Sequence, residues 1–115
     1  MPFILSEFPF TKLVVLGKGE DYDDLIQLTQ RLGIERQVKF RSEFVSEEER
    51  ILHYAMADVC VVSSLYEPFG IVALEAMAAG TPVVATGVGG LLEIVEHDRT
   101  GVVVYPNNPD SLAWG

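Results

Sequence analysis

Two glutamates lie on either side of the start of an apolar segment that the sequence predicts to be a helix. Glu67 comes just before this segment, and Glu75 is the one charged residue within Gly70–Ala79. The free backbone amides of a first helical turn carry the positive end of the helix dipole, which suits a phosphate or a sugar hydroxyl. A carboxylate also has the two acceptors needed to hold adjacent ribose hydroxyls. The spacing therefore predicts a ligand site at this helix start.

Each glutamate also has a purely structural explanation. An unpaired carboxylate in an apolar helix is costly, so Glu75 either meets a ligand or a solvent-lined cleft, or pairs with a residue that the sequence does not reveal. Glu67 precedes a proline near a helix start, where a negative charge is favourable with the dipole alone. Both explanations stay open at the level of the residues.

Two glycine-rich segments each follow an apolar run and precede a helical pattern. Gly17-Lys18-Gly19 matches only the start of the dinucleotide-binding glycine pattern, since Tyr22 occupies its last position. Gly89-Gly90 permits close approach of the backbone to a ligand. A tight strand-to-helix turn is the simpler explanation of Gly17-Lys18-Gly19, and for Gly89-Gly90 a plain turn accounts for the residues as well as a ligand does.

The chain alternates short β-branched runs with longer helical stretches, which is typical of a parallel sheet flanked by helices. We therefore expect an α/β, Rossmann-like fold. Ser46 and Glu49 have the spacing of a capping box, which marks a helix start. The expected strands are Leu13–Leu16, Val38–Phe40, Val59–Val62, Val83–Ala85 and Val102–Tyr105, and the expected helices are Asp21–Leu32, Ser46–Ala57, Gly70–Ala79, Leu91–Glu96 and one beginning at Asp110.

Composition and charge exclude several classes of protein. The 115 residues are 49% apolar and 22% charged, which predicts one globular domain over residues 1–115. The net charge is -9 with scattered Lys and Arg, so nucleic acid is not expected as a partner. No apolar run approaches the ~20 residues of a membrane-spanning helix, and the start of the chain has no basic leader. We expect a soluble cytoplasmic protein.

No metal site is expected from the sequence. Cys60 is the only cysteine and lies in an apolar run, so it predicts a small buried side chain and no disulfide. His53 and His97 are far apart, and neither has metal-ligand spacing with another histidine.

The segment Ser63–Val84 resembles the Glu-x7-Glu signature of the large retaining glycosyltransferase family that includes glycogen and starch synthases. The resemblance extends upstream through Leu16–Gly19 and downstream through Gly89–Val95 and Thr100-Gly101, so it covers nearly the whole chain. Several spaced motifs in the right order are more specific than one short match. The resemblance implies one half of the two-domain GT-B fold, namely the domain that binds the nucleotide sugar.

By this resemblance, Glu75 holds the ribose hydroxyls, while Glu67 and the amides of Phe69 and Gly70 contact the transferred sugar; Glu67 is the expected catalytic residue. The other positions that match the family's donor site are Ile71 and Val72 near the diphosphate, Gly17 and Gly19 near the nucleotide, Val45 beside the nucleobase, and Gly89 and Gly90 in the donor cleft.

The family's reaction retains the configuration at the anomeric carbon and generally requires no metal, so no cofactor is expected. The leaving diphosphate helps to deprotonate the acceptor, and the protein stabilises the growing charge with preorganised donors. The segment from Glu67 to Ile71 is most similar to glycogen and starch synthases. The implied donor is UDP-glucose or ADP-glucose, and the implied reaction moves the hexose to an acceptor such as a glucan.

The chain departs from the family pattern at its start, where the first strand and helix and the cationic loop between them are missing. In the order 3-2-1-4-5-6, that strand lies between those at Leu13–Leu16 and Val59–Val62. The two edges are expected to close up, to recruit Met1–Phe10, or to exchange a strand with another copy. Because the acceptor-binding domain is also missing, we expect the isolated chain to be inactive.

Two other functions compete with this one. A non-catalytic nucleotide-binding or self-associating module remains the alternative, because the basic loop is missing. A nicotinamide-dependent dehydrogenase fits poorly, because the glycine pattern is incomplete and Glu75 lies far outside the interval expected of its ribose carboxylate.

Overall fold

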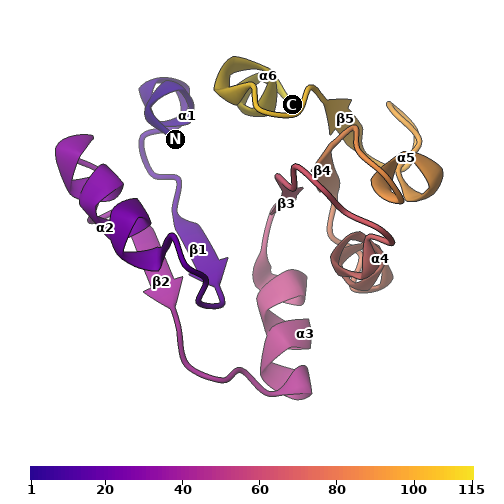
Figure 1. Ribbon diagram of the computed structural model, residues 1–115, viewed down its shortest axis with the longest axis horizontal. Coiled ribbons are helices and arrows are strands. Elements are labelled where there is room, and N and C mark those ends of the chain that lie inside the picture. Colours follow the sequence, from indigo (N-terminus) through magenta and orange to yellow (C-terminus); the bar gives the residue numbers. More distant parts are fainter. The chain divides into compact units, whose positions relative to one another are not determined.

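The computed structural model describes residues 1–115 as alternating helices and strands (Figure 1). The five strands and the predicted helices are found where the sequence placed them, to within two residues at each end. The strands are β1 (Leu13–Leu16), β2 (Val38–Arg41), β3 (Cys60–Val62), β4 (Val83–Thr86) and β5 (Val102–Val104); the helices are α1 (Pro2–Glu7), α2 (Tyr22–Arg31), α3 (Glu47–Met56), α4 (Ile71–Ala78), α5 (Leu91–Ile94) and α6 (Pro109–Trp114).

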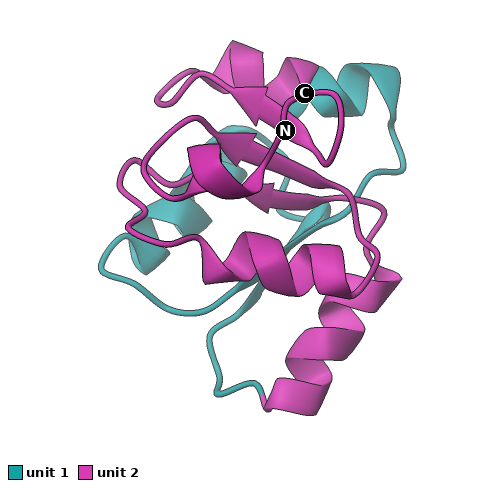
Figure 2. Cartoon of the chain, turned by 90° about the vertical axis from the view of Figure 1, so that its right-hand side faces the viewer, with its two compact units in different colours: residues 1–45 teal, residues 46–115 magenta.

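The strands form two separate parallel sheets, and the chain divides into two compact units, residues 1–45 and 46–115 (Figure 2). Strand β1 pairs only with β2, and β3 pairs only with β4. One domain over residues 1–115 remains a prediction from the length, and within the chain residues 1–45 and 46–115 are each compact. The predicted α/β class with parallel strands flanked by helices is confirmed.

The first unit contains α1, the β1-β2 sheet and α2. Strands β1 and β2 run parallel, with Leu13 opposite Val38 and Leu16 opposite Arg41. The Tyr22 ring, at the start of α2, meets the Phe40 ring edge-on, with 5.6 Å between the ring centroids. The loop between β1 and α2 is therefore held against β2.

The expected recruitment of Met1–Phe10 as an extra strand is wrong. Residues Pro2–Glu7 form the helix α1 instead. Pro2 stands in the first helical turn, where its missing N–H costs no hydrogen bond and its fixed φ suits the helix. Closing of β1 against β3 is also not found, because the two strands belong to different sheets.

The second unit is built on the β3-β4-β5 sheet, with β4 in the centre. All four residues of β4 are buried, as expected for the central strand of a covered parallel sheet. Helix α3 starts with the predicted capping box, in which the Ser46 hydroxyl accepts from the Glu49 amide and the Glu49 carboxylate accepts from the Ser46 amide.

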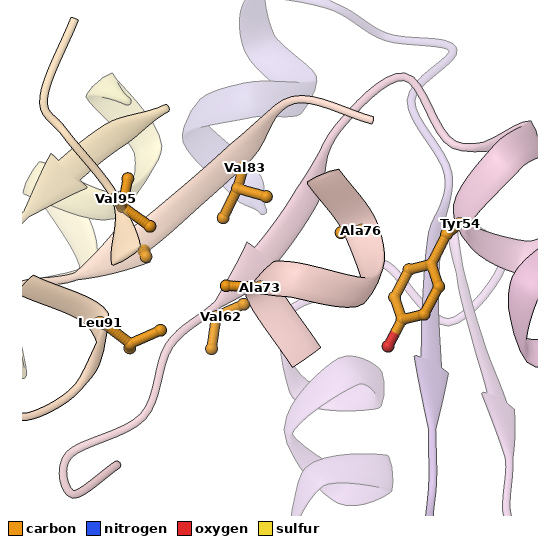
Figure 3. Packing of buried hydrophobic residues seen from close by; sticks show 8 residues of the cluster. Tyr54, Val62, Ala73, Ala76, Val83, Leu91 and Val95 are labelled. Carbon is orange, nitrogen blue, oxygen red and sulfur yellow. The ribbon is translucent and has the colours of Figure 1, made fainter. Parts of the chain in front are cut away.

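The core of this unit lies between α4 and the sheet (Figure 3). Ala73 and Ala76 of α4 are fully buried, and their small side chains allow close packing against Val62 and Val83. Leu91 and Val95 join the same cluster, as does Tyr54 of α3. Helix α4, which carries Glu75 and directly follows the loop of Glu67, is consequently fixed against the sheet. No helix of the chain is both long enough and apolar enough to cross a membrane.

Candidate functional site

The loop between β3 and α4 starts from a fixed point on the sheet. The buried Thr86 hydroxyl, at the end of β4, donates to the carbonyl oxygen of Ser64 at 2.6 Å and lies 3.3 Å from that of Val62. The carboxyl ends of β3 and β4 are thereby tied together. This edge of a parallel sheet is where open α/β folds bind ligands.

Glu67 caps the start of α4 from within this loop. One carboxylate oxygen, Oε1, accepts a hydrogen bond from the Gly70 amide at 3.0 Å, and Oε2 lies 3.4 Å from the Ser64 hydroxyl. Gly70 has a left-handed φ of 92°, which favours glycine, and a Cβ there would meet Leu91 Cδ2 at 2.9 Å. The structure therefore contains the purely structural role expected of Glu67, because its negative charge lies at the positive end of the helix dipole.

The neighbouring amides at the start of α4 have no hydrogen-bond acceptor within the chain. The N–H groups of Phe69, Ile71 and Val72 donate to no acceptor in the chain, whereas that of Gly70 already donates to Glu67. Of the four amides expected to face a ligand, three are free for hydrogen bonding. Phe69 and Ile71 are also exposed, so solvent or a ligand can reach this helix start.

Gly89 and Gly90 pack directly on the backbone of the Glu67 loop. The Gly90 amide donates to the carbonyl oxygen of Glu67 at 2.9 Å. A Cβ on Gly89 would overlap that same oxygen, and a Cβ on Gly90 would lie 2.7 Å from both the Cα and the carbonyl carbon of Phe69. The structure thus brings the two predicted motifs together, and the close approach that requires glycine is to the chain itself.

Glu75 lies one turn further along α4 and is half-buried, with both carboxylate oxygens engaged. Arg50 Nη2 donates to Oε1 at 3.1 Å, and the Tyr54 hydroxyl donates to Oε2 at 3.0 Å. Glu75 therefore has partners that its own segment does not reveal. Each oxygen keeps acceptor capacity, because a carboxylate offers about four lone-pair sites.

Arg50 and Tyr54 were not assigned to the site from the sequence. Both belong to α3 and are four residues apart, so they share one face of it. The four-residue spacing of an arginine and a tyrosine was the signal that the sequence offered for this pair. No pattern in the sequence, however, predicts that α3 packs against α4.

Burial, with a contribution from the hydrogen bond to Glu75, raises the pKa of Tyr54 from 10.0 to about 12. In the unfolded chain the phenol loses its proton near pH 10, while the folded chain keeps it, so stability is complete below pH 10 and is lost as the pH rises toward 12. We expect a loss of about 2 kcal/mol across this window, by the free-energy equivalent of a pKa shift. Urea unfolding at pH 8, 10 and 11.5 measures it.

Tyr54→Phe removes this titrating group and should reduce the dependence to the part contributed by the Cys60 thiol, whose pKa burial also raises, while Tyr105→Phe, which removes an exposed phenol, should leave it unchanged. Identical slopes for Tyr54→Phe and the unchanged chain would contradict the assignment.

The predicted nucleotide-side residues Gly17, Gly19 and Val45 belong to the first unit. Gly17 follows β1 with a φ of 112° and donates its amide to the Arg41 carbonyl oxygen. Gly17 and Gly19 line a pocket of about 260 Å³ together with Lys18, whose ammonium lies 5.6 Å from the centroid of the Tyr22 ring. Val45 is the half-buried last residue of this unit.

No group of three or more His, Cys, Asp or Glu side chains is arranged to hold a metal ion. Burial raises the pKa of the Cys60 thiol, which favours the protonated, unreactive form.

Comparison with known proteins places these motifs in one family. The family model described as "Glycosyl transferases group 1" matches residues 4–115. An uncharacterised glycosyltransferase of Methanocaldococcus jannaschii is 53% identical over the whole chain, which spans 29% of that protein. A glycogen synthase of Mycobacterium tuberculosis is 38% identical over 98% of the chain, which spans 27% of the enzyme.

Solved structures agree with the sequence comparison. HepE of Anabaena in complex with UDP superposes with a TM-score of 0.82 and 32% identity, over 98% of this chain and 33% of that one. The same protein in complex with UDP-glucose gives a TM-score of 0.80 and the same identity and coverage. The chain thus spans at most a third of the length of these relatives.

Proposed function

The chain belongs to the glycosyl transferases group 1 family, and we propose on that basis that it is the donor-binding part of a retaining glycosyltransferase. The enzyme transfers a hexose, glucose, from a nucleoside diphosphate sugar to an acceptor such as a glucan. One observation carries the proposal. In the second unit Glu67 accepts from an amide at the start of α4, the neighbouring amides have no acceptor in the chain, and Glu75 follows one turn later on the same helix, at the kind of sheet edge where open α/β folds bind ligands.

In this proposal Glu75 holds the ribose hydroxyls, and Ile71 and Val72 offer their free amides to the diphosphate. Glu67 and Phe69 contact the transferred sugar. The Gly70 amide joins them only when it exchanges Glu67 for a sugar hydroxyl, since Glu67 occupies it here. Gly17, Gly19 and Val45 act on the nucleotide side, and Gly89 and Gly90 support the loop that carries Glu67.

The proposed donor is UDP-glucose or ADP-glucose. The relationship to a glycogen synthase and to a protein solved with UDP and UDP-glucose supports a nucleotide sugar of this kind. Free amides and a helix dipole stabilise the charge that grows on the departing diphosphate without a metal ion. The diphosphate in turn takes the acceptor proton, and the sugar is retained in configuration. We place this reaction in the cytoplasm.

The isolated chain binds the donor but transfers nothing, because the proposed acceptor site lies on a second domain. Detection of sugar transfer by the purified chain would contradict this part of the proposal.

A second candidate function, a self-associating module, is favoured by the strand edges of β1 and β3, each of which has a partner on one side only. Exchange of a strand between two copies would cover them.

An amide-resolved NMR titration with UDP-glucose, ADP-glucose and GDP-mannose tests the donor-binding function. We expect shifts between Gly70 and Glu75 that single out one donor, with affinity at least about tenfold weaker in Glu75→Ala because a charged hydrogen-bonding partner is lost. Arg99→Ala, in an exposed ion pair remote in sequence, serves as the control. A well-dispersed spectrum that responds to no donor would reject donor binding and leave the module as the explanation.

A further inference from the structure

We propose that Arg50 and Tyr54 are positioning residues that hold the Glu75 carboxylate in the orientation required to bind two adjacent ribose hydroxyls. The inference deepens the proposed function and rests on it. Arg50 Nη2 contacts one carboxylate oxygen and the Tyr54 hydroxyl contacts the other. Both donors come from α3, whereas the carboxylate belongs to α4.

Tyr54 is fixed at both of its ends. Its ring is part of the core cluster beside α4, with 8% of the residue exposed (Figure 3). Its backbone carbonyl accepts a 2.6 Å hydrogen bond from the buried Thr81 hydroxyl, just after α4. The phenol is protonated over the whole physiological range and so remains a donor to Glu75, and its raised pKa extends that range above pH 10. The position of this donor is therefore set by the core and not by the ligand.

Arg50 supplies the charge that balances Glu75. It and Arg99 are the only arginine or lysine residues after Val45, and Arg99 is paired with Glu96. The Arg50 Nε is buried without a hydrogen-bond partner, so the guanidinium is held partly out of solvent for a single contact with the carboxylate. With 41% of its side chain exposed, Arg50 is still open to solvent on its other side, and its ion pair with Glu75 is the one contact that directs it.

The remaining acceptor capacity of Glu75 fits a pair of hydroxyls. One donor on each oxygen leaves a further lone pair on each, spaced as the two oxygens of one carboxylate are. A glutamate held by two donors has already lost its rotamer freedom, so a ligand does not have to supply that entropy. Removing either donor should therefore weaken binding of ligands that carry both hydroxyls, and of those alone.

Calorimetric titration of the chain with UDP, ADP and GDP, and with their 2′-deoxy counterparts, tests this inference. The unchanged chain should prefer the ribonucleotide, and Glu75→Gln should remove the preference. We expect Tyr54→Phe and Arg50→Met each to weaken ribonucleotide binding about three- to tenfold, the effect of one lost hydrogen bond to a charged group. Binding of the 2′-deoxynucleotide should change by less than about twofold, because its contact with Glu75 is already incomplete.

Matched variants separate positioning from general damage. Arg50→Lys should recover part of the preference, while Tyr105→Phe and Arg99→Met, which lack contact with Glu75, should retain all of it. Combining Tyr54→Phe with Glu75→Gln should weaken binding no further than Glu75→Gln alone, since both act through one carboxylate. The amide spectrum of each variant verifies folding, and the Arg50 variants decide the matter if Tyr54→Phe is unfolded.

The outcomes distinguish failure of the positioning role of Arg50 and Tyr54 from failure of the proposed function. If Glu75→Gln removes the ribose preference but the Tyr54 and Arg50 variants keep it, the positioning role is wrong and the proposed function stands. If the unchanged chain shows no ribose preference or binds no nucleotide, the role of Glu75 is wrong and the inference falls with it.

Discussion

Gly89→Ala is expected to destabilise the second unit by about 3 to 5 kcal/mol, through overpacking together with backbone strain. The new Cβ would overlap the Glu67 carbonyl oxygen, and the φ of 46° at Gly89 is unfavourable for alanine. Gly90→Ala separates the two causes, because Gly90 has an ordinary helical φ of -62°. Its collision with the Phe69 backbone alone should cost about 2 to 3 kcal/mol.

Gly80→Ala is the matched control for strain without collision. Gly80 has a φ of 80°, but a Cβ there would have no atom within 4 Å, so we expect a loss of about 1 kcal/mol. Urea unfolding followed by circular dichroism measures all three variants. The order Gly89, Gly90, Gly80 is the expected result, and a Gly90→Ala variant as stable as Gly80→Ala would show that the two loops do not pack as described.

Glu67→Ala is expected to weaken sugar binding and helix capping together. The Gly70 amide loses its acceptor, which should lower stability by about 1 kcal/mol, as for other lost helix caps. In the proposed function Glu67 also contacts the transferred sugar, so affinity for UDP-glucose should fall about tenfold or more relative to UDP, as expected when a charged hydrogen bond is removed. Calorimetry with UDP-glucose and UDP, or ADP-glucose and ADP, provides the comparison.

Glu67→Gln is the control that separates capping from sugar contact. Its side-chain oxygen can still accept from the Gly70 amide, so stability should stay within about 0.5 kcal/mol of the unchanged chain. The loss of charge should still reduce the preference for the sugar nucleotide. Equal affinity for UDP-glucose in both variants and the unchanged chain would show that Glu67 does not contact the sugar.

The elements of the fold could be predicted because local signals and burial agree along most of the chain. The Ser46 and Glu49 capping box is contained within four residues, and the β-branched run of β4 suits the central strand it forms. The helix α1 could not be predicted, because a start with Pro2 permits a helix without requiring one. Propensity over six residues is too weak to exclude a strand there.

The candidate site was predictable as a set of motifs but not as a set of contacts. Glu67 and Glu75 were found from their position around a helix start, yet which groups satisfy them depends on tertiary packing. The partners of Glu75 come from α3, and the choice between ligand and ion pair was open for that reason. The structure adds that a paired Glu75 still has acceptors to offer, so the two explanations are compatible.

The packing of Gly89 and Gly90 on the Glu67 loop has a consequence for comparing relatives. Their close contacts are with backbone atoms, which every sequence supplies whatever side chains stand at positions 67 to 69. Selection for this loop packing alone should therefore keep both glycines in descendants that have lost their enzymatic role. In such lineages the glutamates are held only by their structural contacts, which stabilise the fold less than the glycine packing, so they should be lost before the glycines. Retention of the glycine pair then diagnoses shared ancestry of the fold, and retention of Glu67 and Glu75 diagnoses shared chemistry.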